Sequence, residues 1–351
     1  MKLRCVGTVG PLLAAVVCAW SAALPAHATP AVPGVLSQPA LQTPRAQGAA
    51  MLAIARAGTR LVSAGERGIV LLSDDGGTNW RQASVPVQVT LTALRFVDDK
   101  TGWAAGHLGV ILKTLDGGAT WNVQLDGIRA AALMAQSLRA AADDKSVRAA
   151  QRLEEEGPDK PFFDLDFIDA QRGVAVGAYN TAFMTQDGGH TWTPLAPRLP
   201  NPKSLHLYAV RYAGSSLYIA GEQGLLLKSA DGSNFESLSS PYKGSFFGLL
   251  AARSGTLLAY GLRGNAFRST DGGMSWEKAA SNTIVSLNAG IELPDRTLVL
   301  LSQAGEVLHS RDDGRSFTRT SSNPTPAAGL AATERGHIVL AGLRGVRRPT
   351  P

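Results

Sequence analysis

The stretch Thr185-Gln186-Asp187-Gly188-Gly189-His190-Thr191-Trp192 decides the fold of this chain. It combines a hydroxyl residue, an aspartate, a glycine and a large aromatic residue at fixed spacing. The aspartate can accept hydrogen bonds from the backbone amides of its own turn, and the hydroxyl group can bond across the same turn. The glycine permits positive φ, and the aromatic ring becomes buried where neighbouring sheets meet. The pattern is therefore typical of a tight turn between two short strands.

Outward from this turn, the same unit recurs seven times. Each unit has a strand of small residues such as Gly173-Val174-Ala175-Val176-Gly177, a Gly-x-x-Gly-like turn, a short strand and the aspartate turn. The second turn position falls at residues 68, 109, 180, 224, 264, 305 and 345, so the units are 40 to 44 residues apart except for one interval of 71. A period near 40 without helical periodicity indicates propeller blades. We predict an all-β, seven-bladed β-propeller over residues 50–351.

The aspartate turns, called Asp-boxes below, are interpreted as folding devices. Six equivalent copies around a ring cannot form one active site. Their aspartates and tryptophans are Asp75, Asp116, Asp187, Asp231, Asp271, Asp312, Trp80, Trp121, Trp192 and Trp276.

These motifs carry a family resemblance. The turn resembles the Asp-box, or bacterial neuraminidase, repeat. The longer unit, here Gly173 to Gly177 followed by Thr185 to Trp192, is similar to the photosystem II stability and assembly factor family of seven-bladed propellers. The resemblance covers about residues 50–351 apart from the long interval. It implies a non-enzymatic scaffold with an arginine patch that engages a photosystem II reaction-centre protein.

The first 28 residues are predicted to be a signal peptide. Lys2 and Arg4 precede an apolar stretch, and Ala26-His27-Ala28 has the small-x-small pattern of a cleavage site. We therefore expect a periplasmic protein that begins at Thr29 and does not span the membrane. Cleavage would remove both cysteines, which excludes thiol nucleophiles, disulfides and thiolate metal sites in the mature chain. It would also reduce the net charge from +6 to +4.

Two segments lie outside the repeats. Residues 29–49 are predicted to close blade seven, with Val32 to Leu41 pairing with Val346 to Arg348; the alternative is a disordered tail. Residues 126–160 form the long interval between blades two and three. Its alanine-rich part, Ile128 to Glu156, is predicted to be helical and broken at Asp143-Asp144, where an aspartate can cap a second helix. This insertion is either a solvated elaboration or an arm that grips a partner.

Arginines are the candidate partner-binding residues. Turns of the same kind place their side chains on one face of the ring, and guanidinium groups hold carboxylates in pairs of hydrogen bonds. The alternative is that scattered surface arginines only aid solubility. The candidates are Arg67, Arg263, Arg344, Arg347 and Arg348.

We consider the remaining polar residues as metal ligands or catalytic groups. Asp164 and Asp166 share one face of an inner strand, where they either bind a cation in the channel or form a wet strand face. The histidines lack metal-ligand spacing, and neither a phosphate loop nor a nucleophile elbow occurs. We therefore expect no catalytic residue, no metal and no cofactor.

The leading hypothesis is an exported, monomeric binding scaffold for a membrane-protein complex or its anionic segment, in a photosynthetic host or another. The modest positive charge does not indicate nucleic acid. The alternative is an Asp-box glycoside hydrolase, since two carboxylates on separate loops would suffice.

Overall fold

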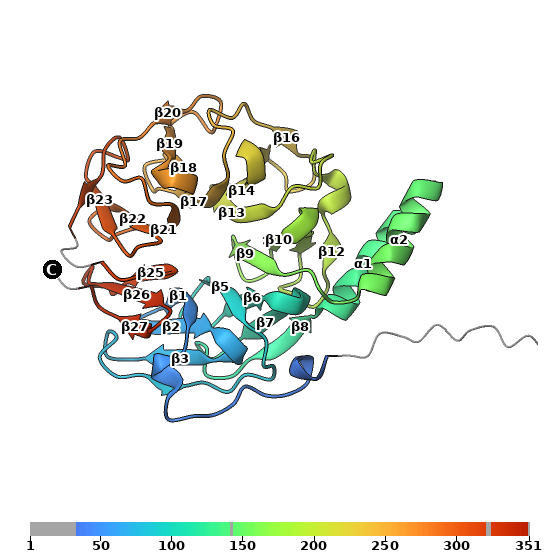
Figure 1. The fold of residues 1–351 in the computed structure, drawn as a ribbon, viewed down its shortest axis with the longest axis horizontal. Coiled ribbons are helices and arrows are strands. Elements are labelled where there is room, and N and C mark those ends of the chain that lie inside the picture. Colours follow the sequence, from blue (N-terminus) through green and yellow to red (C-terminus); the bar gives the residue numbers. More distant parts are fainter. Residues whose placement is uncertain (1–32, 141–142, 321–323, 350–351) are drawn as a thin grey trace, which may run out of the picture. The chain divides into compact units, whose positions relative to one another are not determined.

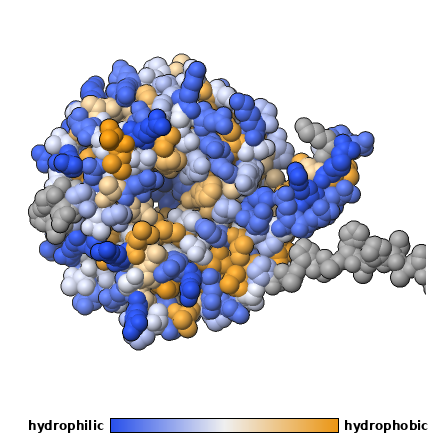
Figure 2. Space-filling view, viewed as in Figure 1, coloured by the Kyte–Doolittle hydropathy of each residue, from blue (hydrophilic) through white to orange (hydrophobic). Residues whose placement is uncertain are grey.

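The computed structural model describes residues 33–140, 143–320 and 324–349, and these residues belong to one compact unit. The predicted signal peptide, its cleavage site before Thr29 and both cysteines lie outside the described residues. Seven antiparallel sheets surround a central axis (Figure 1), and the space-filling view shows a hollow at the hub (Figure 2). The predicted seven-bladed β-propeller is confirmed.

Each blade runs outward from the hub in chain order. Blade one contains β1 (Met51–Ala57), β2 (Arg60–Gly65), β3 (Val70–Ser73) and β4 (Arg81–Gln82). Blade two contains β5 (Leu91–Phe96), β6 (Gly102–Gly106), β7 (Ile111–Thr114) and β8 (Asn122–Leu125). Blade three contains β9 (Phe162–Phe167), β10 (Gly173–Gly177), β11 (Ala182–Thr185) and β12 (Thr193–Pro194). Blade four contains β13 (Leu207–Ala213), β14 (Ser216–Gly221), β15 (Leu226–Ser229) and β16 (Glu236–Ser237).

The remaining blades repeat this order, except that the last sheet has three strands. Blade five contains β17 (Phe246–Ala251), β18 (Leu257–Gly261), β19 (Ala266–Ser269) and β20 (Glu277–Lys278). Blade six contains β21 (Leu287–Glu292), β22 (Leu298–Ser302), β23 (Val307–Ser310) and β24 (Thr318–Arg319). Blade seven contains β25 (Gly329–Ala332), β26 (Ile338–Gly342) and β27 (Gly345–Arg347).

In six of the seven blades the second strand ends in glycine, where it passes closely over the start of the inner strand of the same blade. In blade one, a side chain at Gly65 would lie 2.0 Å from the carbonyl oxygen of Ala50, so only glycine fits there. Larger side chains fill the spaces between blades: Trp103 of β6 is completely buried and stacks on Phe167 of β9, with ring centroids 3.6 Å apart. Its indole nitrogen donates to the carbonyl oxygen of Gly188 in the next blade. The core is therefore a series of hydrophobic layers between adjacent sheets.

The Asp-box of blade three shows the hydrogen bonds on which the repeat depends. Asp187 Oδ1 accepts from the backbone N–H of Thr191 at 2.9 Å and from Thr185 Oγ1 at 2.9 Å. Thr185 Oγ1 also accepts from the backbone N–H of Gly189, whose φ of +95° suits glycine. The other five boxes hold their aspartates in the same way through Ser73, Thr114, Ser229, Ser269 and Ser310. All six carboxylates are thus engaged within their own turns.

These hydrogen bonds lower the pKa values of the Asp-box carboxyl groups. Hydrogen bonds from the hydroxyl and backbone N–H of Ser275 lower the pKa of Asp271 to about 2. Partial burial raises the pKa of Asp187 and Asp312, but hydrogen bonds from Thr191 and Ser316 outweigh it, and both pKa values are about 2. Each group is therefore a stronger acid in the folded chain than in the unfolded chain.

We expect acid to unfold the protein through these turns. A carboxyl group whose pKa falls on folding stabilises the fold above its unfolded pKa, and this contribution is lost as the pH falls toward the folded pKa. The melting temperature should stay nearly constant from about pH 7 to pH 5 and fall steeply between about pH 4 and pH 2. Circular dichroism melts across this range measure it. A melting temperature that is unchanged down to about pH 2.5 would contradict this assignment.

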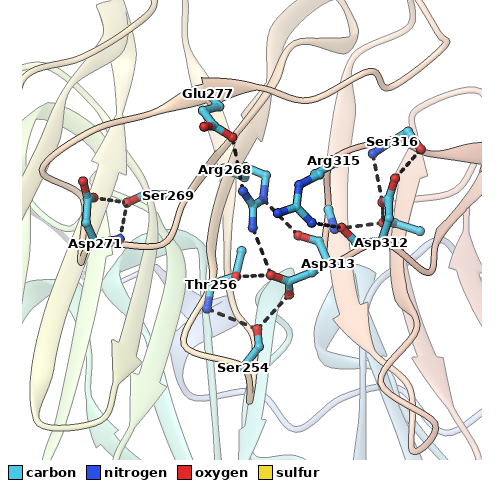
Figure 3. A network of polar contacts seen from close by, with 12 residues as sticks. Ser254, Thr256, Arg268, Ser269, Asp271, Glu277, Asp312, Asp313, Arg315 and Ser316 are labelled. Atoms are coloured by element: carbon cyan, nitrogen blue, oxygen red, sulfur yellow. Dashed lines mark hydrogen bonds and ion pairs between the residues drawn. The ribbon is translucent and has the colours of Figure 1, made fainter.

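Cations link consecutive blades at the Asp-box end. Lys113 Nζ of β7 donates to the carbonyl oxygen of Gly188 in blade three at 2.8 Å. In blade five, Arg268 of β19 is 5% exposed and forms ion pairs with Glu277 and with Asp313 of blade six (Figure 3). Its Nε also donates to the carbonyl oxygen of Asp313 at 3.1 Å. A cation from the third strand therefore connects one blade to the aspartate turn of the next.

The ring closes differently from the prediction. Within the described residues β27 pairs only with β26, and residues 33–49 pair with neither. Residues 33–49 run along blade one instead. The backbone N–H of Ala40 donates to the carbonyl oxygen of Val85, and the backbone N–H of Gln88 donates to the carbonyl oxygen of Val35. The predicted pairing of Val32 to Leu41 with Val346 to Arg348 is therefore wrong.

The sequence of this segment explains the difference. Pro33, Pro39 and Pro44 have no backbone N–H, and the 3-10 turns η1 (Gly34–Leu36) and η2 (Ala46–Gly48) interrupt any extended strand. Blades seven and one are joined by side chains instead. Met51, Leu61 and Leu71 pack in one cluster with Ala331, Val339 and Ala341.

The insertion consists of two helices, α1 (Gly127–Arg139) and α2 (Asp144–Glu156), which extend beyond the rim of the ring (Figure 1). Asp126 caps α1 by accepting from the backbone N–H of Arg129, and Asp143 caps α2 by accepting from that of Ser146. Arg139 and Glu154 connect the two helices through an ion pair of 2.6 Å. The predicted break at Asp143-Asp144 is confirmed. Neither helix of this described part has the length and hydrophobicity needed to cross a membrane.

Candidate binding face

Every blade has two ends, and the turns at these ends differ in chemistry. One end holds the Asp-boxes, and the opposite end holds the turns between the second and third strands, called the Gly-x-x-Gly face below. Five of these turns form a short 3-10 turn at this face. They are η3 (Glu66–Gly68), η4 (His107–Gly109), η5 (Ala178–Asn180), η7 (Glu222–Gly224) and η8 (Leu262–Gly264). A further 3-10 turn, η6 (Ala196–Arg198), lies between blades three and four.

The central residue of each of these five turns adopts left-handed backbone geometry. This conformation is unfavourable for any residue with a side chain, yet it recurs with φ between 50° and 57°. The residues are Arg67, Leu108, Tyr179, Gln223 and Arg263. Except for the half-buried Leu108, their side chains are exposed. The repeat therefore presents one variable side chain per blade to solvent on a common face.

The structure brings together three of the five candidate arginines on this face. Arg67, Arg263 and Arg344 are exposed, and none of their side chains forms an ion pair with another described residue. Arg344 lies in blade seven and Arg67 in blade one, which are neighbours in the ring (Figure 1). Their guanidinium groups are therefore available to a ligand with carboxylates.

The other two candidate arginines make contacts within the fold. Arg347 is half-buried and donates to the carbonyl oxygen of Thr325, and burial lowers its pKa. Arg348 donates to the carbonyl oxygen of Gly76 at 2.8 Å, in the Asp-box of blade one. Because β27 runs away from the Gly-x-x-Gly face, Arg348 reaches the opposite end of the ring. There it repeats the contact that Lys113 makes to Gly188 between blades two and three.

A cavity of about 680 Å³ lies at the hub, lined by the inner strands of all seven blades. Two carboxylates line it, and arginines engage both. Glu292 Oε1 lies 2.9 Å from Arg253 Nε, and Asp164 Oδ2 lies 2.5 Å from Arg211 Nη1. Neither carboxylate is therefore a free acid or nucleophile in this cavity.

Asp164 and Asp166 connect neighbouring blades, which differs from both sequence-based alternatives. Asp164 Oδ2 also accepts from the backbone N–H of Val210, and Asp166 Oδ2 accepts from that of Tyr212 at 2.7 Å. Asp166 is 1% exposed and lies 2.7 Å from Arg95 Nε, so it does not lie on a wet strand face. Burial raises the pKa of Asp164, and Arg211 opposes this shift. The described residues contain no group of three potential metal ligands.

Sequence reasoning missed a continuous group of aromatic rings, called the aromatic arc below. It consists of Phe163, Tyr179, His206, Tyr208 and Phe247. Tyr179 lies against His206 with ring centroids 4.6 Å apart, and its backbone N–H donates to His206 Nδ1. Phe163 and Tyr208 are 5.4 Å apart, as are Tyr208 and Phe247. The signal was available: three consecutive blades have an aromatic residue as the second residue of the inner strand.

The comparisons with known proteins agree with this fold and repeat. Residues 72–142 and 140–305 match the family of photosynthesis system II assembly factor YCF48, which covers about two thirds of the chain. The chain belongs to this family. A relative in this family is the photosystem II assembly lipoprotein Ycf48 of Synechococcus sp. (strain CC9902), 30% identical over 127 residues. The match spans 34% of this chain and 37% of that protein, so little more than a third of the relative's length is covered.

Solved structures of family members share the architecture. The structure described as YCF48 bound to D1 peptide has a TM-score of 0.62 and 16% identity, covering 90% of this chain and all of that one. YCF48 from Cyanidioschyzon merolae has a TM-score of 0.63 and 13% identity, covering 87% and 96%. The WD40 β-propeller domain of Doa1 is equally similar, with a TM-score of 0.64 and 11% identity, covering 89% and 95%. At these identities the likeness establishes the propeller fold alone.

Proposed function

We propose that this protein is a non-enzymatic scaffold, exported to the periplasm, that aids the assembly or stability of a membrane-protein complex. The Gly-x-x-Gly face is the binding surface, and an anionic segment of the client is the ligand. The single observation that carries this proposal is the exposure of Arg67, Arg263 and Arg344 on one face without partners in the described chain. Arginine binds carboxylates strongly because its guanidinium group can donate two parallel hydrogen bonds to them.

Family membership supports this assignment. One solved relative is described as YCF48 bound to D1 peptide, and another relative is named a photosystem II assembly lipoprotein. The client of this chain is accordingly a photosystem II protein in a photosynthetic host, or another envelope complex elsewhere. The relative's lipoprotein name and the signal-like residues 1–28 support export.

The geometry does not favour a glycoside hydrolase. Such an enzyme needs two available carboxyl groups facing each other across a bound sugar. Both carboxylates that line the hub cavity are held by arginines, and the Asp-box carboxylates are held by their own turns. The scaffold therefore remains the function with the better physical support.

The test is recovery of the client from detergent-solubilised membranes of the host. Tagged wild type is compared with the triple variant Arg67→Ala, Arg263→Ala and Arg344→Ala. We expect the triple variant to lose at least about 90% of the client, because each arginine forms charge-assisted hydrogen bonds with it. Binding to wild type should also weaken as salt rises, because the attraction is electrostatic.

A matched triple variant controls for net charge. Arg311, Arg315 and Arg335 are exposed and lie at the Asp-box end of the blades. Their replacement by alanine removes the same charge from the opposite end and should leave recovery unchanged. Equal recovery with wild type and the first triple variant would reject the arginine face. Equal loss with both triple variants would show that only net charge matters.

A further inference from the structure

The aromatic arc lies on the proposed binding face and extends into the hub cavity. Phe163, Tyr208 and Phe247 belong to the adjacent inner strands β9, β13 and β17, and all three line the cavity. These strands lie side by side on one side of the hub, across from β1 and β25 (Figure 1). Each ring stands at the strand end nearest the Gly-x-x-Gly face. The arc is therefore one wall of the cavity mouth.

The opposite wall of the mouth is smaller. The equivalent positions of the other four blades are Leu52, Thr92 and Asn288 in the inner strands and Ala328 directly before β25, and all four also line the cavity. One step deeper, β21 and β25 carry the small residues Ala289 and Gly329. Large flat rings on one side and small residues on the other leave room for a guest side chain.

The arc is half-open to solvent. Tyr179 is 63% exposed, and the other four residues are half-buried. Left-handed backbone geometry, with φ of +50°, holds Tyr179 on the surface at a conformational cost. The Nζ of Lys160, at the end of the helical insertion, lies 5.6 Å from the Tyr179 ring centroid. This cation–π contact also helps to hold the ring in place. An ordered aromatic surface of this kind loses little conformational entropy when it binds a ligand.

The Gly-x-x-Gly face thus carries both aromatic residues and arginines without ion-pair partners among the described residues. Aromatic residues and arginine are enriched at protein interfaces and among the residues that contribute most to binding. We propose that the aromatic arc is an anchor site for one aromatic or branched aliphatic side chain of an extended, acidic client segment. The anchor side chain enters the cavity mouth against Tyr208 and Phe247. The carboxylates of the same segment pair with arginines of the face. This inference rests on the proposed function and names the chemistry of its partner.

Charge complementarity indicates that the bound segment is acidic. Arg67 and Arg344 lie in blades one and seven, across the hub from the aromatic arc, and both are exposed. A segment that lies across the mouth therefore meets aromatic rings on one side and cations on the other. An extended chain reaches about 3.3 Å per residue, so about ten residues extend for roughly 33 Å. A short linear segment is thus long enough to engage both groups.

The test uses two fluorescein-labelled peptides of about eleven residues with four carboxylates each. The first has a central phenylalanine, and the second has serine at that position. Fluorescence anisotropy gives the Kd of each for wild type, Phe247→Ala and Tyr179→Gly. Glycine at residue 179 removes the ring and accepts the left-handed backbone without strain. Ile284→Ala is the matched control, because Ile284 is an exposed apolar residue outside the arc.

We expect wild type to bind the phenylalanine peptide at least about tenfold more tightly than the serine peptide, as befits a buried anchor. Phe247→Ala should abolish this difference, and Tyr179→Gly, at the exposed end of the arc, should reduce it, whereas Ile284→Ala should preserve it. The arginine triple variant should weaken both peptides equally. Phe247→Leu, which conserves most of the volume, gives the same comparison if the alanine variant does not fold.

Three results would overturn the anchor site. The first is equal affinity of wild type for the two peptides; if the arginine triple variant still weakens both, the proposed function survives. The second is no binding of either peptide at millimolar concentration. The third is binding of a neutral glucan hexasaccharide that depends on Phe247 and Tyr179, which would assign the arc to sugar stacking instead.

Discussion

Replacing Trp103 by alanine lowers the free energy of unfolding by about 4 kcal/mol, the usual cost of removing a fully buried large aromatic side chain. The ring is fully buried between blades two and three and stacks on Phe167. Its N–H donates to the carbonyl oxygen of Gly188, and Lys113 Nζ lies 5.3 Å from the ring centroid. The substitution therefore leaves a large cavity and removes contacts that join two blades.

Chemical denaturation followed by circular dichroism measures this loss as a lower midpoint. Met274→Ala is the control, because Met274 is 74% exposed at an Asp-box, and its truncation should change stability by less than about 0.5 kcal/mol. A loss below about 1 kcal/mol for Trp103→Ala would mean that the interface between blades two and three contributes little to stability.

Replacing Asp313 by glycine destabilises the fold by about 3 kcal/mol, because it leaves a buried guanidinium group with less compensation. Asp313 Oδ2 lies 3.0 Å from Arg268 Nη2 and accepts from Thr256 Oγ1 at 2.5 Å (Figure 3). All five other Asp-boxes have glycine at the corresponding position. Asp313 itself has φ of +59°, so glycine relieves backbone strain there, and the predicted loss arises from the side chain alone.

The double variant Arg268→Met and Asp313→Gly separates the two contributions. Removing both partners eliminates the uncompensated buried charge, so most of the lost stability should return. Denaturation midpoints of the wild type, both single variants and the double variant complete the cycle. If the double variant is as unstable as the sum of the single variants, Arg268 and Asp313 do not interact.

The sequence predicted the blades because their information is local. A turn such as Thr185 to Trp192 needs a hydroxyl group, a carboxylate and a glycine within a few residues, and its hydrogen bonds form among those same residues. The break between α1 and α2 was predictable for the same reason, since Asp143 caps the backbone N–H of the neighbouring Ser146. The spacing of the repeats then predicted the number of blades.

The candidate site was only partly predictable. The turn positions placed Arg67, Arg263 and Arg344 on one face, because the repeat fixes where each turn lies. Proximity in sequence was misleading for Arg348, which strand β27 carries to the other end of the ring. Asp164 and Asp166 showed the correct alternation, but alternation does not reveal that backbone amides of β13 and arginines of neighbouring blades surround these carboxylates.

The amino-acid order by itself thus determined the number of blades, their turns and the helical insertion, since these depend on contacts between residues close in the chain. Only the tertiary structure decided how the ring closes, which charges are neutralised between blades and which aromatic rings meet at the hub. Those features depend on pairs of residues about 40 or more positions apart, such as Tyr208 and Phe247 or Arg348 and Gly76. No local pattern records such pairs, because packing between complete sheets is what brings them together.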